Sequence, residues 1–237
     1  YPKFLRDTAV SRLDENSWEA ELTDDWSIGG VANGGYSMAT AARALAESLD
    51  HKDPLSITGH YLSRVEPGKA LLEVEKLNIG KSVSTALLKF IQGGEERIRF
   101  TSCFTDFAKS KGDTLREVEA PDFPPIEECI AMPYKEGFTP VLEKQIDRKF
   151  TPHSDWWDED RPRARACLDA YYAWPGGEDI DLFSVIFFLD TMSPPIFNRL
   201  GSRGWVPSLE LTVHLKQSPS PGPLRMRGKT DFITSGF

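Results

Sequence analysis

The chain has 237 residues, of which 40% are hydrophobic, and this is enough apolar material to bury the core of one large or two small globular domains. Its 36 acidic residues outnumber its 28 basic ones, giving a formal net charge of −8, and the basic residues are scattered along the sequence. Nucleic acid is therefore excluded as an expected partner, because binding its phosphates takes a concentrated basic surface.

The cysteines and the apolar runs further limit the class of protein to which the chain can belong. Cys103, Cys129 and Cys167 are odd in number and widely spaced, which predicts free thiols in a reducing compartment rather than disulfides or a zinc site. The most apolar run, residues 182–189, is far shorter than the roughly 20 residues of a membrane-spanning helix, so we expect no membrane span. We also expect no signal peptide, no metal and no cofactor.

Residues 17–108 have the order strand, glycine-rich turn, helix and four further strands. The helix is expected at about residues 36–49, where repeated alanines favour helix and allow a sheet to approach its backbone closely. Short Pro-Gly, Gly-Lys and Gly-Gly connections between the later strands indicate an antiparallel meander. Its strands are expected at residues 56–64, 70–79, 82–92 and 97–107. This half therefore predicts an antiparallel sheet wrapped round one buried helix.

The same order returns in the second half by pattern, though not by residue identity. It consists of a strand at 164–173, a Gly-Gly turn, a helix at about 180–191, and strands at 207–217 and 224–234. The proline-containing sequence between the halves has little periodicity and is interpreted as a linker that crosses the surface.

The predicted organisation has three parts. They are an N-terminal module at residues 1–108, a linker at 109–160 and a C-terminal module at 161–237. The second module has only two predicted strands after its helix, where the first has four. We therefore expect this module to be truncated and the natural protein to continue past Phe237 by about two strands.

Several motifs occur in a fixed order along the chain. The first half contains WSIGGVANGGY at 26–36, EPG at 66–68, GKS at 80–82 and SCF at 102–104. The second half contains FLDTMSPP at 188–195 and WVPSLELTVH at 205–214. In order and spacing they resemble the acyl-CoA thioesterase-like superfamily, in its double hot-dog, thioesterase II-like branch.

The resemblance implies an α+β fold of two tandem hot-dog modules, each an antiparallel sheet wrapped round a long helix, with the active site where the modules meet. It implies hydrolysis of acyl-CoA or a related acyl thioester in lipid metabolism, by a water held by an Asp, a Thr or Ser, and a Gln. The Asp falls on Asp190 and the hydroxyl on Ser208, with Glu210 as a supporting residue on the same strand. The Gln has no counterpart and is expected beyond Phe237. The glutamines of this chain are Gln92, Gln145 and Gln217.

The chemistry explains why these residue types are needed. Thioester hydrolysis requires an attacking water, a group that orients or deprotonates it, and donors for the developing oxyanion. A helix N-terminus offers unpaired NH groups and the positive end of the helix dipole. Asn33, Gly34 and Gly35 stand at the start of the first helix and are therefore predicted to bind the substrate or its oxyanion.

Each of these residues also has a purely structural interpretation. Asp190 could end a helix that the following prolines cannot continue. Ser208 and Glu210 could form the polar face of an ordinary strand. Asn33 and the two glycines after it could be only a helix cap and a tight turn.

Two other functions stay open at this point. One is a hot-dog enzyme of a biosynthetic pathway that changes an acyl or polyketide-like intermediate by dehydration, isomerisation or cyclisation, without hydrolysis. The other is a non-catalytic acyl-binding protein. A dehydratase with an Asp and His on its central helix is disfavoured, because neither predicted helix carries a His. The protein is expected to be a monomer or homodimer, since two modules in one chain already supply the usual pairing, and to be cytoplasmic or peroxisomal.

Overall fold

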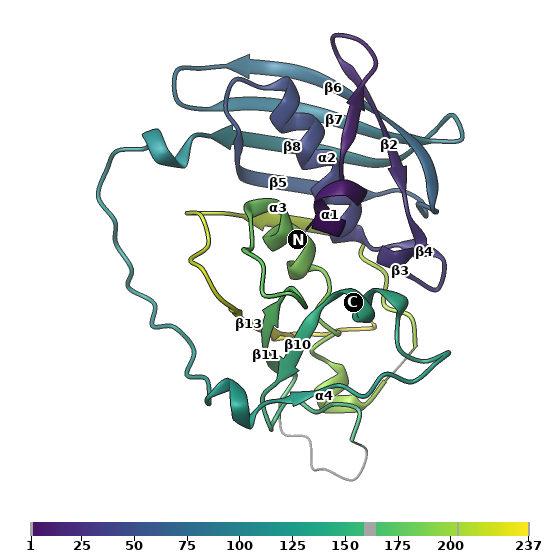
Figure 1. Ribbon diagram of the computed structural model, residues 1–237, viewed down its shortest axis with the longest axis vertical. Coiled ribbons are helices and arrows are strands. Elements are labelled where there is room, and N and C mark those ends of the chain that lie inside the picture. Colours follow the sequence, from purple (N-terminus) through teal and green to yellow (C-terminus); the bar gives the residue numbers. More distant parts are fainter. Residues whose placement is uncertain (1, 159–164, 203, 237) are drawn as a thin grey trace.

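The computed structural model describes residues 2–158, 165–202 and 204–236, and it has the expected α+β architecture of two hot-dog modules (Figure 1). The large sheet has the strand order β1-β2-β6-β7-β8-β5-β12 and a second sheet has the order β13-β11-β10-β9, with antiparallel pairing throughout. The strands of the large sheet are β1 (Val10–Arg12), β2 (Ser17–Leu22), β6 (Gly68–Ile79), β7 (Ser84–Gln92), β8 (Glu95–Thr105), β5 (Asp53–Tyr61) and β12 (Glu210–His214). Those of the second sheet are β13 (Leu224–Lys229), β11 (Cys167–Ala173), β10 (Asp147–Phe150) and β9 (Ile130–Ala131).

The remaining elements are short except for one helix. The α-helices are α1 (Pro2–Asp7), α2 (Gly34–Ser48), α3 (Leu182–Leu189) and α4 (Phe197–Leu200). The 3₁₀ turns and the small hairpin are η1 (Asp24–Trp26), η2 (Phe107–Lys109), η3 (Ile126–Glu128), η4 (Val141–Gln145), β3 (Ser27–Ile28) and β4 (Val31–Ala32).

Helix α2 is the central helix of the first module, and the large sheet curves over it (Figure 1). It begins two residues earlier than predicted because the side-chain oxygen of Asn33 accepts a hydrogen bond from the backbone NH of Tyr36 at 3.0 Å, which caps the first turn. Four of its five alanines are buried and Ala46 is partly buried, and their small side chains let the sheet lie close to the helix.

The predicted meander is correct for β6, β7 and β8 but wrong for β5. Strand β5 pairs with β8 instead of β6, so the chain crosses from one side of the sheet to the other after β5. The sheet has to wrap round α2, and the strand that directly follows the helix therefore lies on the opposite side of the sheet from β6. Spacing along the chain carries no information on which edge a strand joins.

The second module repeats the order of the first, with β11, α3, β12 and β13 in place of β2, α2, β5 and β6. In the first module β7 and β8 lie between β6 and β5. Within the described part of the chain no strand lies between β13 and β12, and the expected continuation past Phe237 stays a prediction. Strand β12 pairs with β5 from Glu210 opposite His60 to His214 opposite Ser56, so the two modules share a continuous sheet.

The segment interpreted as a linker is only partly a surface crossing. The chain after β8 runs along the outside of the molecule (Figure 1), but β9 and β10 belong to the second sheet. In β10, Arg148 and Phe150 are buried and alternate with more exposed neighbours. β10 is only four residues long and contains a buried arginine, so its alternation of apolar and polar residues is too weak to be recognised in a proline-containing segment. The predicted boundaries of the two modules stay a prediction.

The N-terminal helix α1 lies where the two modules meet (Figure 1). Phe4 is 1% exposed, and its ring centroid lies 5.2 Å from that of Trp26 in the first module. It lies 5.2 Å from Trp174 and 5.0 Å from Phe187 in the second module. Rings in edge and tilted contact at these distances stabilise a shared core, so α1 joins both modules.

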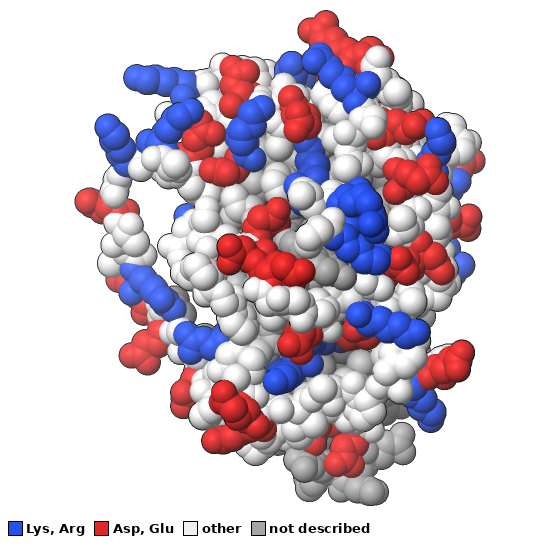
Figure 2. Space-filling model, in the orientation of Figure 1, with Lys and Arg blue, Asp and Glu red and all other residues white. Residues whose placement is uncertain are grey.

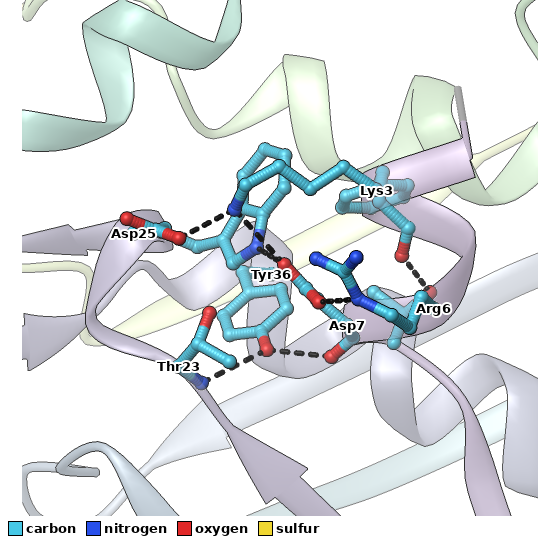
Figure 3. Close-up of polar contacts among 9 residues, drawn as sticks. Lys3, Arg6, Asp7, Thr23, Asp25 and Tyr36 are labelled. Carbon is cyan, nitrogen blue, oxygen red and sulfur yellow. Dashed lines mark hydrogen bonds and ion pairs between the residues drawn. The ribbon is translucent and has the colours of Figure 1, made fainter.

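Asp7, the last residue of α1, is buried beside this aromatic core. Two cationic side chains and an indole NH surround its carboxylate as hydrogen-bond donors (Figure 3). Its carboxylate accepts hydrogen bonds from Trp26 Nε1 at 3.0 Å, Lys3 Nζ at 3.1 Å and Arg6 Nε at 2.9 Å. Its backbone carbonyl accepts one from the Tyr36 hydroxyl at 2.6 Å. Burial raises the pKa of Asp7, but the hydrogen bonds from Trp26, Arg6 and Lys3 outweigh this, and the pKa lies below its usual value.

Candidate functional site

Asp190 is the residue directly after α3, and its carboxylate faces the N-terminus of α2 in the other module. Its backbone NH donates to the Phe187 carbonyl at 3.2 Å, which closes the last turn of the helix. The helix ends two residues earlier than predicted. Asp190 therefore does end a helix, as its structural interpretation holds, and it also projects a carboxylate across the boundary between the modules.

Three groups donate hydrogen bonds to this carboxylate. The backbone NH of Gly35 donates to Oδ2 at 2.9 Å, and Asn33 Nδ2 donates to the same oxygen at 3.0 Å. Ser208 Oγ donates to Oδ1 at 3.0 Å. Asn33 Nδ2 also donates to the backbone carbonyl of Asp190 at 3.0 Å. Residues from three separate segments thus meet on one side chain.

Gly34 and Gly35 are required because Asp190 and the end of α3 lie very close to the backbone of α2 at these two positions. A Cβ on Gly34 would lie 2.8 Å from Asp190 Oδ2, and one on Gly35 would lie 2.8 Å from both Asp190 Cβ and the Phe187 carbonyl oxygen. These separations are too short for any side chain. The two glycines therefore let α3 and its terminal carboxylate approach the first turn of α2. Of the four glycines in residues 29–35, those with a positive φ are Gly29 and Gly30, in the turn between β3 and β4.

The pKa of Asp190 is set by its burial and by the lack of a Lys or Arg partner among the described residues. Burial raises its pKa above the usual value, and the hydrogen bonds from Gly35, Ser208 and Asn33 offset only part of this effect. Among residues 2–158, 165–202 and 204–236, no Lys or Arg forms an ion pair with it. All its side-chain partners are donors, so the group is held as an acceptor at the positive end of the α2 dipole.

The structure brings together all the predicted site residues except Glu210. Ser208 lies two residues before β12 rather than within it, and its half-buried side chain turns towards Asp190. Glu210 is exposed, and its Oε1 accepts a hydrogen bond from the Thr212 hydroxyl at 2.6 Å. The sequence analysis placed both residues on one strand. The chain is not yet in strand conformation at Ser208, so that placement is wrong.

Two residues that the sequence did not indicate hold the site from either side. The Tyr61 hydroxyl donates to the Gly34 carbonyl at 2.9 Å. Arg148, which is 5% exposed, donates to the Thr191 carbonyl at 2.5 Å and thereby holds the residue that follows Asp190. A cation at this carbonyl also suits the negative end of α3. Tyr61 ends an ordinary strand and Arg148 lies in the proline-containing segment, so neither carries a local signal.

A cleft of about 1450 Å³ lies away from this site, on the second sheet beneath the segment that contains Phe123. Four of the charged residues in its walls form two ion pairs with each other. Arg227 donates to Asp169 at 2.7 and 2.6 Å. Lys229 lies 2.8 Å from Asp231. On the face seen in Figure 2, basic side chains are likewise interspersed with acidic ones. We therefore place the candidate site at Asp190, where donors converge on an unpaired carboxylate, rather than in the larger cleft.

The part of the chain that the structure describes contains no group of three or more His, Cys, Asp or Glu side chains that could hold a metal ion. Nor does any described helix combine the length and apolarity needed to cross a membrane.

The comparisons with known proteins identify the family. Residues 22–105 match the model of the acyl-CoA thioesterase N-terminal domain, and residues 126–237 match that of the acyl-CoA thioesterase C-terminal domain. The chain belongs to the acyl-CoA thioesterase-like superfamily, among the double hot-dog, thioesterase II-like proteins.

Two solved structures share this fold over nearly the whole chain. A protein from Thermobifida fusca, provisionally designated a thioesterase II, is 26% identical with a TM-score of 0.88, covering 99% of this chain and 88% of that one. Acyl-CoA thioesterase II TesB2 from Mycobacterium marinum is 14% identical with a TM-score of 0.76, covering 98% and 88%. The thioesterase-like protein TwmA from Talaromyces wortmannii is 32% identical over 94 residues, which are 38% of this chain and only 27% of that protein.

Proposed function

We propose that the protein hydrolyses acyl-CoA or a related acyl thioester, with Asp190 and Ser208 holding the attacking water. The observation that carries this proposal is the convergence of donors from both modules on a carboxylate that forms no ion pair with any Lys or Arg among the described residues. Oδ1 accepts one hydrogen bond, from Ser208, and therefore keeps acceptor capacity for a water. The hydroxyl oxygen of Ser208 can accept from the same water.

In this proposal the water oxygen attacks the thioester carbon and its proton passes to Asp190. The carbon–sulfur bond then breaks, and the sulfur takes the proton back from Asp190 and leaves as free CoA thiol, while the acyl group keeps the remaining OH of the water and leaves as a carboxylic acid. A carboxylate whose pKa is raised by burial is a stronger base than an exposed one, which suits the first step. Water held by two neighbouring groups gains mainly from positioning.

We assign Asn33 and Gly35 to holding the carboxylate rather than the oxyanion. The Gly35 NH and the Asn33 amide both donate to Asp190, so they are engaged before any substrate arrives. The Asn33 oxygen is also engaged, because it accepts from Tyr36. A role of these residues as direct oxyanion donors would require them to release Asp190.

The Gln implied by the family resemblance stays a prediction. Gln92 is engaged elsewhere, since its side chain accepts from the NH of Glu66 and donates to the Glu66 carbonyl on the outside of the first module. Gln145 lies in η4, and Gln217 follows β12.

A second candidate function is a hot-dog enzyme that changes an acyl or polyketide-like intermediate without hydrolysis. One observation favours it: among the described residues no Gln joins Asp190 and Ser208, so the trio for water activation is incomplete there. A carboxylate with a raised pKa also suits proton transfer to or from a substrate carbon.

The deciding experiment is a panel of acyl-CoAs of increasing chain length, with released CoA detected by a thiol reagent. We expect the unaltered protein to release thiol and Asp190→Asn to lose about 10²- to 10⁴-fold of that rate, the usual contribution of a general base. Asp147→Asn, at an exposed position on β10, is the matched control and should keep full activity. A substrate changed in mass spectra without thiol release would favour the second candidate.

A further inference from the structure

Tyr61 contacts both segments that hold the Asp190 carboxylate. Its backbone NH donates to the carbonyl of Leu209 at 3.0 Å, in the residue next to Ser208. Its hydroxyl donates to the carbonyl of Gly34 at 2.9 Å, in the residue next to Gly35. Ser208 and Gly35 are the donors to the two opposite oxygens of Asp190. One residue at the end of β5 thus joins the two sides of the site.

The phenol of Tyr61 is fixed beside the carboxylate by packing. Its ring lies edge-on to Phe100, with centroids 6.4 Å apart and planes at 83°. A Cβ on Gly34 would lie 3.0 Å from the Tyr61 ring and 2.8 Å from Asp190 Oδ2, so ring and carboxylate border the same small space. Burial and then the charge on Asp190 raise the pKa of Tyr61 well above its usual value. The hydroxyl therefore stays protonated and donates.

We propose that Tyr61 is a positioning residue, which keeps the Gly35 NH and the Ser208 hydroxyl on opposite oxygens of Asp190 during thioester hydrolysis. This role rests on the proposed function of the site. The backbone bond to Leu209 survives Tyr61→Phe, whereas the bond to Gly34 depends on the phenol hydroxyl alone. Loss of the hydroxyl leaves the first turn of α2 unrestrained on this side.

The surroundings of Asp190 determine the direction of the expected change. Donors come from the first turn of α2 through Gly35, from its capping residue Asn33, and from the segment before β12 through Ser208. Tyr61 on β5 is the titratable neighbour whose pKa responds to the Asp190 charge. Hydrogen bonds to a carboxylate favour its ionised form, so a weaker Gly35 contact shifts the pKa of Asp190 further upward.

The test compares Tyr61→Phe with Tyr171→Phe. Tyr171 is a matched control because its hydroxyl also donates to a backbone carbonyl, that of Pro124 at 2.9 Å, away from the site. For Tyr61→Phe we expect kcat to fall about 3- to 10-fold, as for loss of one neutral hydrogen bond, with KM within about twofold. The acidic limb of the kcat/KM profile should move to higher pH. Tyr171→Phe should change none of these.

A measurement that needs no activity separates this inference from the proposed function. The Asp190 carboxyl carbon, assigned by its loss in Asp190→Asn, is titrated by ¹³C NMR in the unaltered protein and in Tyr61→Phe. A higher midpoint in Tyr61→Phe supports the positioning role, even if no acyl-CoA is hydrolysed. An unchanged midpoint overturns it, even if hydrolysis is confirmed. Because the ring and its contact with Phe100 remain, the variant should fold.

Discussion

Asp7 and Asp190 both lie at the junction of the two modules, but they are held in opposite ways. Asp7 accepts hydrogen bonds from Lys3, Arg6 and Trp26, two of which carry positive charge. Within the described part of the chain, Asp190 accepts only from neutral groups. The pKa of Asp7 lies below its usual value and that of Asp190 lies above it.

This difference supports Asp190, rather than Asp7, as the proposed base. A carboxylate stabilised by cations binds a proton weakly, so it is a poor base and a good structural anchor. A half-buried carboxylate held by neutral donors keeps its geometry and binds a proton more readily. Both residues end a helix or follow one directly, so position in the secondary structure does not distinguish them. The charges of their neighbours do.

The largest expected effect is on turnover. Asp190→Asn should lower kcat/KM for the best acyl-CoA by about 10²- to 10⁴-fold, because it removes the proposed base. Asp7→Asn, measured at a temperature where the variant is fully folded, should stay within about threefold of the unaltered protein. Equal losses in the two variants would mean that the contrast in their neighbours does not separate structural from chemical roles.

The second effect is on stability, and here Asp7→Asn should have a larger effect than Asp190→Asn. Asp7→Asn should lower the free energy of unfolding by roughly 1–3 kcal/mol, because hydrogen bonds to charged groups are lost in a buried place. Asp190→Asn should leave it unchanged or raise it slightly, because the raised folded-state pKa of Asp190 means that its ionised carboxylate lowers stability at neutral pH. Its amide oxygen can accept from Gly35 and Asn33, and its NH₂ can donate to the Ser208 oxygen. Urea unfolding of both variants at neutral pH measures the difference. A loss at Asp190 as large as at Asp7 would contradict this expectation.

A smaller effect is expected at Ser208. Ser208→Ala removes one neutral hydrogen bond to Asp190, so kcat should fall about 3- to 10-fold. Ser208→Thr should recover most of the rate, since the hydroxyl is kept. Thr212→Ala is a suitable control because that hydroxyl donates to Glu210 on the exposed side of β12. If Ser208→Ala retains the full rate, the serine does not help to hold the water.

The smallest effect is on how stability changes with pH, and the two aspartates contribute with opposite sign. Asp7 has a lowered folded-state pKa, so its stabilisation is present above the unfolded-state pKa and is lost as pH falls through the folded-state value. Asp190 has a raised pKa, so stability is greatest below the unfolded-state value and is lost as pH rises through the folded-state value.

Urea midpoints of the unaltered protein and both variants across acidic pH measure these slopes. Asp7→Asn should reduce the loss of stability on acidification. Asp190→Asn should reduce the loss on raising the pH from the acidic side. Variants whose curves run parallel to that of the unaltered protein would rule out both contributions.

Much of the first module could be predicted from local sequence. The alanines of α2, the Asn33 cap and the turns between β6, β7 and β8 act over a few residues, and they indicated the right elements. The resemblance placed Asp190 and Ser208, which the structure brings together. It also placed Glu210, which lies on the exposed side of its strand instead.

Contacts between residues far apart in the chain were decided only by the tertiary structure. The sequence by itself determined the helix cap, the helix and most strands, because propensity and periodicity depend on near neighbours. It could not reveal that Gly34 and Gly35 admit a carboxylate from the other module, nor that Tyr61 joins the two sides of that carboxylate. Those arrangements depend on how β12 pairs with β5 and how α3 packs on α2. Such packing is decided by the whole core, and no short stretch of sequence encodes it.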